Sequence, residues 1–421
     1  MNGDAPKRRR SLSHVGGEVQ TRGDREAARA LADALHVAPS VVDESETQAH
    51  VHGFHPYPAR MHPRTARRFV EAFSKPRDAV LDPFCGSGTV LVEARLAGRF
   101  AAGVDANPLA VRLARLKATT TNEDERKTLI EWAHKIAQTA DVRRTSRAGA
   151  SRLFPNADTS LFDAHVLLEL DGLRVGLEGF RPRSAREEWA KEALWLVLSA
   201  ILTKVSRRAS ETSAQEAPRR LFAGYVAKLF VKKAEELARK LAEIEPMLKG
   251  APGLWVSEGD ARVLAGIDSG AVNLTVTSPP YAGVYDYAAH HEARLRWLGH
   301  DDRPFRAREI GARERFSSAD PRAGRAAWDE ELLAVLRSLR RVSSDTALAV
   351  FLIADSTVGR SAVYADDRMA ELAGLAGFEP VAVASQERPN FHAQSSAAFA
   401  RRPRREHAVL LSAVVAPTSH S

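Results

Sequence analysis

The sequence lacks the features of secreted, membrane-spanning and multi-cysteine metal proteins. One cysteine in 421 residues excludes an internal disulfide framework and a multi-cysteine zinc site, and it is typical of a reducing compartment. We therefore expect no metal. The longest apolar stretch, residues 193–202, contains Ser199 and is far shorter than the roughly 20 residues that span a bilayer. The basic residues 1–10 lead into polar sequence without the apolar core of a signal peptide, so we expect a cytoplasmic protein without membrane contact.

The excess of positive charge is small. Sixty-one lysines and arginines face 53 aspartates and glutamates, which leaves a net charge of +8. Such a surplus favours contact with a polyanion, but it is also common in ordinary soluble proteins, so charge alone does not identify a partner. Hydrophobic residues make up 44% of the chain and charged residues 27%, values typical of a folded protein with a sizeable core.

Short apolar runs alternate with helical sequence in two separate parts of the chain. Residues 79–81 and 100–105 form such runs, and a helical pattern follows each of them. Further strand-like runs lie at 254–256, 272–276, 347–353, 380–384 and 407–415. Because successive strand–helix units build a parallel, doubly wound sheet, we expect an α/β fold.

The stretch between these two parts reads as helical. Its candidate helices lie at 123–139, 186–207 and 219–246. We predict a largely flexible basic N-terminal arm (1–45) with one short helical candidate at 25–35, then the first half of a sheet domain (46–120). A helical insertion (121–250), the second half of that domain (251–415) and a tail (416–421) follow.

The first apolar run ends in a glycine-rich turn. Ligands of open α/β sheets bind at the carboxyl ends of the strands. Here residues 82–89 read DPFCGSGT, in which Gly86 and Gly88 let the backbone pass close to a ligand. Neither a phosphate-binding Walker loop nor a full dinucleotide fingerprint is present. Asp105 ends the next strand, where a carboxylate accepts hydrogen bonds from both ribose hydroxyls or caps the following helix.

A second strand end carries groups suited to amine chemistry. Residues 277–281 read TSPPY. An exocyclic base amine is a poor nucleophile because its lone pair is delocalised, so a catalyst must orient its hydrogens. Ser278 Oγ and the Pro279 carbonyl can accept them, Pro280 stiffens the backbone, and Tyr281 offers a ring face to an extruded base. The alternative for this motif taken alone is a structural proline turn after an edge strand.

Together the two motifs resemble those of the amino-directed (N4-cytosine/N6-adenine) DNA methyltransferases, with a Ser-Pro-Pro-Tyr catalytic motif. Residues 54–63 are similar to the segment that closes over the methionine end of the cofactor in some of these enzymes. The resemblance covers residues 50–120 and 250–415. It implies a Rossmann-like class I methyltransferase sheet with a helical insertion, and S-adenosyl-L-methionine as cofactor.

The resemblance also implies which residues form the site. Asp105 would hold the cofactor ribose, and Asp260 would approach the adenine amino group. The cofactor-binding residues it implies are Tyr57, Asp82, Pro83, Phe84, Gly86, Gly88, Thr89, Asp105 and Asp260. The catalytic residues it implies are Ser278, Pro279, Pro280 and Tyr281.

The activity implied is direct methyl transfer to the amine of a flipped DNA base, with cytosine N4 favoured over adenine N6 because of Ser278. Both amines offer two hydrogens to the same acceptors, so the motif does not separate them. The alternatives are an RNA base amino-methyltransferase and an inactive nucleic-acid-binding protein with the same fold. The recognition sequence, the oligomeric state and a restriction or phage-defence partner are left open.

Two further regions are candidates for contact with nucleic acid. The insertion at 121–250 separates the two motifs, whose order is the reverse of that in many Ser-Pro-Pro-Tyr enzymes, and is a possible target-recognition region. Two arginine-rich segments could follow a phosphate backbone or be solvated loops. They contain Arg303, Arg306, Arg308 and Arg313 in one, and Arg388, Arg401, Arg402, Arg404 and Arg405, with Phe391 and His392, in the other.

Overall fold

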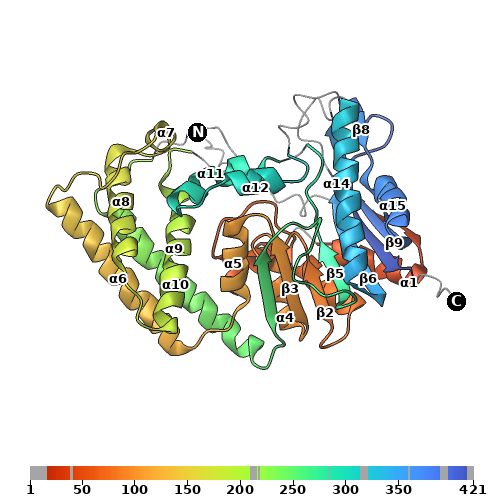
Figure 1. Cartoon of the computed structure of the whole chain (residues 1–421), viewed down its shortest axis with the longest axis horizontal. Helices are drawn as coiled ribbons and strands as arrows, with labels where there is room; N and C mark the ends of the chain where they lie inside the picture. The colour runs from red at the N-terminus through yellow and green to blue at the C-terminus, as the bar shows by residue number, and fades with distance from the viewer. Residues whose placement is uncertain are drawn as a thin grey trace, which may run out of the picture.

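A mainly parallel sheet of eight strands forms the centre of the computed structural model (Figure 1). The structure describes residues 17–37, 41–208, 216, 219–283, 285–312, 321–358, 361–388 and 397–414. The strand order is β1-β9-β10-β6-β5-β2-β3-β4. The strands are β1 (Val19–Gly23), β2 (Ala79–Asp82), β3 (Phe100–Asp105), β4 (Leu254–Glu258), β5 (Val272–Thr277), β6 (Ser343–Ala354), β9 (Phe378–Glu387) and β10 (Arg405–Ala413). The α/β, Rossmann-like fold expected from the sequence is confirmed.

Strands β2 to β6 of this sheet run parallel, and β10 enters antiparallel between β6 and β9. Successive side chains of a strand point to opposite faces, so both faces of these apolar strands are buried. In β6, Val350 and Leu352 belong to one core cluster, whereas Phe351 and Ile353 belong to the other. The carboxyl ends of the parallel strands consequently meet at one edge of the sheet.

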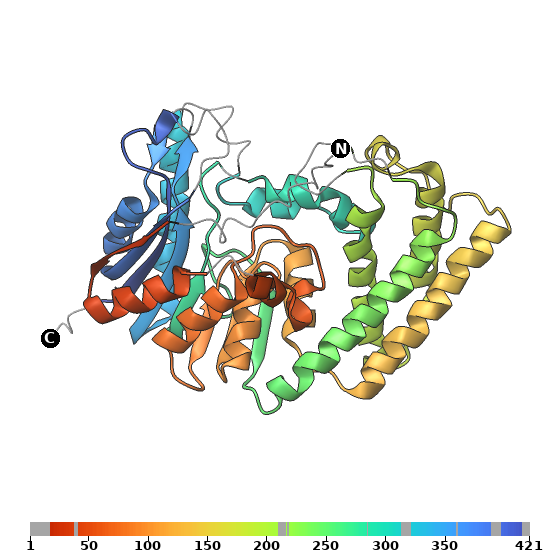
Figure 2. The same cartoon turned by 180° about the vertical axis from the view of Figure 1, so that it is seen from behind.

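Helices cover both faces of the sheet (Figures 1 and 2). The first face is covered by α1 (Arg25–Leu35), α3 (Pro63–Phe73), α4 (Thr89–Leu96) and α5 (Pro108–Ala118). The second is covered by α14 (Pro321–Val342) and α15 (Ala365–Leu375). The remaining short elements are α2 (Val41–Gln48), η2 (His50–Gly53), η3 (Glu245–Leu248), α11 (Tyr287–Trp297), α12 (Arg303–Arg308), β7 (Ser356–Val358) and β8 (Ser361–Val363). The sheet is therefore the middle layer of three.

The insertion forms a helical bundle beside the β4 edge of the sheet (Figure 1). Its helices are α6 (Glu123–Thr145), α7 (Asn156–Leu161), α8 (Ala164–Gly179), α9 (Ala185–Val205) and α10 (Tyr225–Ile244). The helices expected at 123–139, 186–207 and 219–246 are thus confirmed as α6, α9 and α10. Helix α8 was not expected. A Cβ on its Gly172 would lie 2.9 Å from the Ala140 Cα, so the glycine lets α8 approach α6 closely.

The flexible arm expected over 1–45 is wrong for most of the described part of that range. Residues 19–23 form β1, which pairs antiparallel with β9 at the edge of the main sheet. Helix α1 follows, where the short helical candidate at 25–35 was expected, and is capped by Asp24, whose Oδ1 accepts a hydrogen bond from the Ala27 amide at 2.9 Å. It buries Leu31 and Leu35. Residues 1–16 and the expected tail at 416–421 lie outside the described residues. None of the described helices is both long and apolar enough to cross a membrane.

Candidate active site

One pocket opens where the carboxyl ends of β2, β3, β4 and β5 meet. It encloses about 670 Å³, including its mouth, within the range of small-molecule sites. Its walls are formed by Tyr57, Ala59, Pro83, Phe84, Gly86, Asp105, Ala106, Gly259, Asp260, Ala261, Ser278, Pro280, Tyr287, Phe305, Arg308, Glu309 and Ile310. The glycine loop and the Ser-Pro-Pro-Tyr motif, 195 residues apart at Asp82 and Thr277, therefore contribute to a single cavity.

The two glycines of the loop have different positions. Gly86 lines the pocket with φ +49°, and a Cβ there would lie 3.4 Å from the Tyr57 ring. Gly88, with φ +84°, lies against α5, and a Cβ there would lie 2.8 Å from the Ala114 Cα. Gly86 thus keeps the pocket wall free of a side chain, while Gly88 allows close packing of the loop. Gly88 and Thr89 are not among the pocket-lining residues.

Asp105 faces the pocket with acceptor capacity left over. Its Oδ2 accepts a hydrogen bond from the Gly86 amide and its Oδ1 one from the Asn107 amide, both at 2.8 Å. A carboxylate has about four lone-pair sites, so two remain for a ligand. Burial raises the pKa of Asp105 to about 6, although both amide hydrogen bonds act in the opposite direction.

Asp82 lies behind the pocket wall. Its Oδ1 accepts hydrogen bonds from the Thr277 hydroxyl at 2.7 Å and from the Phe84 amide at 3.1 Å. Burial raises its pKa to about 7. Asp82 therefore connects the cofactor-loop end of β2 to the end of β5, directly before Ser278. Its neighbours Pro83 and Phe84 line the pocket itself.

Tyr57 places the segment at 54–63 on the pocket wall. Its hydroxyl accepts a hydrogen bond from Asn107 Nδ2 at 3.3 Å, and its ring stacks on that of His291, with centroids 4.7 Å apart. His291 is fully buried, and burial lowers its pKa to about 3, so the imidazole is neutral. The stacked pair connects the segment before the glycine loop to α11.

Asp260 lines the pocket but already has a cationic partner. Its Oδ2 lies 2.7 Å from Arg262 Nη2. Burial alone would raise the pKa of Asp260, but the hydrogen bonds and charge of Arg262 lower it below the usual value. The carboxylate is therefore ionised at neutral pH and held at one side of the cavity.

The Ser-Pro-Pro-Tyr motif is ordered by hydrogen bonds behind the pocket. Ser278 and Pro280 line the cavity, whereas Pro279 and Tyr281 do not. Tyr281 donates its only hydroxyl hydrogen to the Leu352 carbonyl at 3.3 Å. In the 3.2 Å contact between the two hydroxyls, Ser278 is consequently the donor. The lone pairs of Ser278 Oγ therefore remain available on the pocket side, where they can accept a hydrogen bond from an amine.

The sequence does not predict the roof of the pocket, although Arg308 belongs to a segment named as a possible phosphate contact. Phe305 and Arg308 of α12 and the following Glu309 and Ile310 line it. Tyr287, the first residue of α11, lines it too, and its amide donates to Glu309 Oε1 at 2.6 Å. A tyrosine six residues after the TSPPY motif was a local signal for this side. No periodicity in the sequence shows that α12 folds back over the pocket.

The expected arginine-rich segments are largely occupied by carboxylates. Arg303, Arg306 and Arg308 pair with Asp301, Asp302 and Glu258. Arg388, Arg402 and Arg405 pair with Glu406, Asp366 and Glu387. Arg404 donates to the Asp355 carbonyl at 3.0 Å. Arg313, Phe391 and His392 lie outside the described residues. Among the described arginines of these segments, Arg401 is exposed without an ion pair, and the Arg303 side chain is 86% exposed in a weak surface pair. The others are engaged within the protein.

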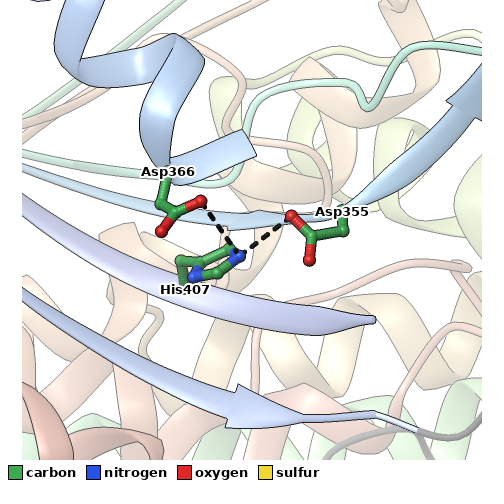
Figure 3. Close-up of side chains that lie close together, drawn as sticks. All are labelled: Asp355, Asp366 and His407. Atoms are coloured by element: carbon green, nitrogen blue, oxygen red, sulfur yellow. Dashed lines mark hydrogen bonds and ion pairs between the residues drawn. The ribbon is translucent and has the colours of Figure 1, made fainter. Parts of the chain in front are cut away.

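Three buried side chains of types that can bind metals, Asp355, Asp366 and His407, lie close together (Figure 3). His407 Nε2 lies 3.0 Å from Asp355 Oδ1 and 3.7 Å from Asp366 Oδ1. Protein donors already occupy both carboxylates. The amides of Ala365 and Arg405 donate to Asp355, and Arg402 and Arg22 pair with Asp366. The cluster connects the end of β6 to α15 and β10. Its carboxylate oxygens accept hydrogen bonds from, or form ion pairs with, groups of the protein itself.

The sequence comparisons match the part of the chain that carries the glycine loop. Residues 23–116 match the model of the DNA methylase family (N6_N4_Mtase). Over 81 residues the chain is 35% identical to Type II methyltransferase M.MjaII of Methanocaldococcus jannaschii. Over 78 residues it is 37% identical to Type II methyltransferase M.MvaI of Kocuria varians. These matches span 19% and 18% of this chain and only 15% and 17% of the two relatives.

Several solved structures resemble the chain, but only weakly. One is the rRNA methyltransferase aviRa from Streptomyces viridochromogenes, which is 12% identical, with a TM-score of 0.35 and coverage of 89% of this chain and 94% of that one. The sequence matches, not this likeness, connect the chain to the amino-directed DNA methyltransferases. The cofactor of that family is S-adenosylmethionine. The side-chain-free wall at Gly86 and the spare acceptor positions of Asp105 fit such a cofactor.

Proposed function

From the premise that residues 23–116 have the sequence of an amino-directed DNA methylase, we propose that this chain methylates an exocyclic amine of a DNA base. One observation carries the proposal. A single pocket contains both the cofactor-loop groups Gly86 and Asp105 and the amine acceptor Ser278. S-adenosylmethionine, when bound, supplies an electrophilic methyl group. The residues of this chain bind that cofactor, orient the amine and exclude water.

We assign the cofactor end of the pocket to the residues at the ends of β2, β3 and β4. Asp105 accepts hydrogen bonds from the ribose hydroxyls, since two of its acceptor positions are free. Asp260 lies at the end of the neighbouring strand, where its ionised carboxylate accepts from the adenine amino group. Phe84 and Tyr57 form apolar walls, and Gly86 allows close approach. Gly88 and Thr89 act indirectly, through the packing and helix start of the loop.

The amine end of the pocket is assigned to Ser278 and Pro279. Ser278 Oγ accepts one amine hydrogen because its own hydrogen is directed to Tyr281. The Pro279 carbonyl accepts the other. The carbonyl of Pro280 is already engaged by Trp328 Nε1 at 3.3 Å, which fixes the turn. Holding both hydrogens would orient the nitrogen lone pair toward a bound methyl donor, and the methylated nitrogen would then pass one proton to solvent.

The preferred base is cytosine at N4, with adenine N6 as the second candidate. The base reaches the pocket by rotating out of the duplex, because an amine within a paired stack cannot approach a buried methyl donor. Tyr287 and Phe305 add ring faces to the roof of the pocket. The Type II names of the two relatives suggest a restriction or phage-defence setting with a nuclease partner.

The test is methylation of duplex DNA of varied sequence by the purified protein with isotope-labelled S-adenosylmethionine. Nucleoside mass spectrometry then identifies the product. We expect N4-methylcytosine. Labelled N6-methyladenine alone would overturn the preference for cytosine. Label in RNA but not in DNA would overturn DNA as the substrate. Cofactor binding by calorimetry without label in either polymer would indicate an inactive binding protein.

A further inference from the structure

One end of the helical bundle carries exposed cations that have no carboxylate partner among the described residues. This end contains the last turn of α6, the end of α9 and the start of α10. Its exposed cations are Arg147, Lys204, Arg208, Arg219, Arg220 and Lys228, which we call the basic end. The end lies on the same side of the molecule as α11 and α12 (Figure 1), and these two helices contribute residues to the active-site pocket.

Hydrogen bonds hold the segments of the basic end together. Arg219 donates to the carbonyls of Thr203 and Lys204, which connects the start of the segment before α10 to the end of α9. His165 Nε2 donates to the Leu221 carbonyl at 3.0 Å. Buried Glu169 accepts from the amides of Gly224 and Val226 at 2.6 and 3.0 Å, which caps α10. The cations are therefore displayed on ordered backbone, which lowers the entropic cost of binding.

Most carboxylates near these cations are already engaged. Asp163 pairs with Arg207 at 2.7 Å, and Asp141 pairs with Arg144 at 3.2 Å. Asp171 accepts from the Ser151 hydroxyl and amide at 2.6 and 2.8 Å. Glu216, whose backbone bridges that of Arg208, is exposed. Among the described residues of this end, Glu216 is an exposed carboxylate without an ion pair, set against six exposed cations, so the end carries a net positive charge.

A second cavity lies between the basic end and α11. It encloses about 760 Å³ between the bundle and α11. Thr203, Ser206 and Arg208 line it from the bundle, and His290 and Arg294 line it from α11. Helix α11 begins at Tyr287, which lines the active-site pocket. Helix α11 therefore contributes residues to both cavities.

We propose that the basic end is a docking surface for the phosphate backbone of duplex DNA, which it holds while a base enters the pocket. The proposal rests on the proposed function, which supplies the polymer. Cations that neutralise phosphates release counterions from DNA, and this release drives binding. Phe222 is 62% exposed and lies beneath Lys228 Nζ, 5.9 Å from its ring centroid, so it offers an apolar contact among the cations.

The test compares two variants of equal charge change in the full-length protein. The first replaces Lys204, Arg208, Arg220 and Lys228 with glutamine. The control replaces Arg181, Arg183, Arg239 and Lys249, exposed cations at the opposite end of the bundle. Fluorescence anisotropy measures the Kd for a labelled duplex of about 30 base pairs at several salt concentrations, and calorimetry measures cofactor affinity. Each phosphate contact contributes about 0.9 to the slope of log K against log salt.

We expect the basic-end variant to bind DNA about 10- to 100-fold more weakly, with a slope reduced by about 3 to 4 and unchanged cofactor affinity. The control should stay within about threefold of the wild type. Equal Kd values for the two variants would overturn the docking surface even where the wild type methylates DNA. A wild type that binds DNA through the basic end but never methylates it would instead overturn the proposed function. Preferential loss of RNA binding would overturn duplex DNA as the partner.

Discussion

The arginines around the sheet and the cations at the end of the bundle differ in what faces them. Near the sheet, Arg402 contacts buried Asp366 at 2.7 Å, and Arg388 contacts Glu406 at 2.6 Å. At the bundle end, Arg208 and Arg220 are exposed, with no ion pair among the described residues. A paired arginine contributes to the fold, whereas an unpaired one is available to a polyanion. The density of arginine along a sequence is therefore a poor guide to a nucleic-acid surface.

Gly86→Val is expected to have the largest effect, because it should weaken cofactor binding at the sheet without changing DNA binding at the basic end. The backbone there has φ +49°, and the new side chain would point toward Tyr57 in the cofactor pocket. We expect cofactor affinity measured by calorimetry to fall by at least about 100-fold, since strain and steric overlap act together. DNA affinity should remain within about twofold, because the basic end is untouched. Parallel loss of both affinities would show that the two regions do not act separately.

Arg402→Gln is expected to have the next largest effect. It leaves the carboxylate of Asp366, 3% exposed, with Arg22 as its remaining cationic partner at 3.1 Å. Removing one of the two cationic partners of a buried carboxylate leaves its charge only partly compensated, so we expect a loss of about 2–3 kcal/mol in the free energy of unfolding, measured with urea. Arg220→Gln is the matched control and should change stability by less than about 0.5 kcal/mol. A reversed ranking of the two variants would remove the distinction between paired and unpaired arginines.

Cofactor binding is expected to depend on pH through Asp105, whose pKa is raised to about 6 by burial. Below that pH the carboxyl is protonated and has lost acceptor capacity for the ribose. Cofactor affinity should therefore rise about tenfold from pH 5 to pH 7 and then level off. Asp105→Asn should bind more weakly with a nearly flat profile. An unchanged pH profile in this variant would show that another group is responsible.

The smallest effect is expected for Tyr281→Phe. This change keeps the ring and removes the hydroxyl that accepts from Ser278, so the Ser278 hydrogen is free to turn toward the pocket. We expect kcat to fall about five- to tenfold while KM for DNA and cofactor affinity stay unchanged. A change in KM with constant kcat would mean that Tyr281 contributes to base binding rather than to the orientation of Ser278.

The central strands could be predicted because each is an apolar run that ends at a polar turn, and parallel strands are buried on both faces. Strand β1 could not. Its sequence, VQTRG, is mostly exposed, and only backbone pairing to β9 makes it a strand. Helix α8 was missed because its two interior glycines weaken the helical signal, although they serve its packing on α6.

In the site, too, residues with a local sequence signature could be predicted, whereas residues placed by distant parts of the chain could not. Gly86, Asp105 and Ser278 lie at strand ends with local signatures, and the structure brings them into one pocket. Asp82 lies behind the pocket wall because it accepts a hydrogen bond from Thr277, which is remote in sequence. The roof from α12 and the basic end both depend on tertiary packing. Which arginines remain unpaired is decided by carboxylates that the linear sequence does not place beside them.

The pairing of β1 with β9 has a consequence for synthesis of the chain. Val19 lies opposite Gln386, so one of the first described segments needs one of the last as its partner. During translation the chain emerges at about 5–20 residues per second, so β1 stays unpaired for tens of seconds while the rest is made. Closure of this edge is thus a late event. A ribosome that stalls before β9 is complete would leave a nascent chain whose first strand has nothing to join.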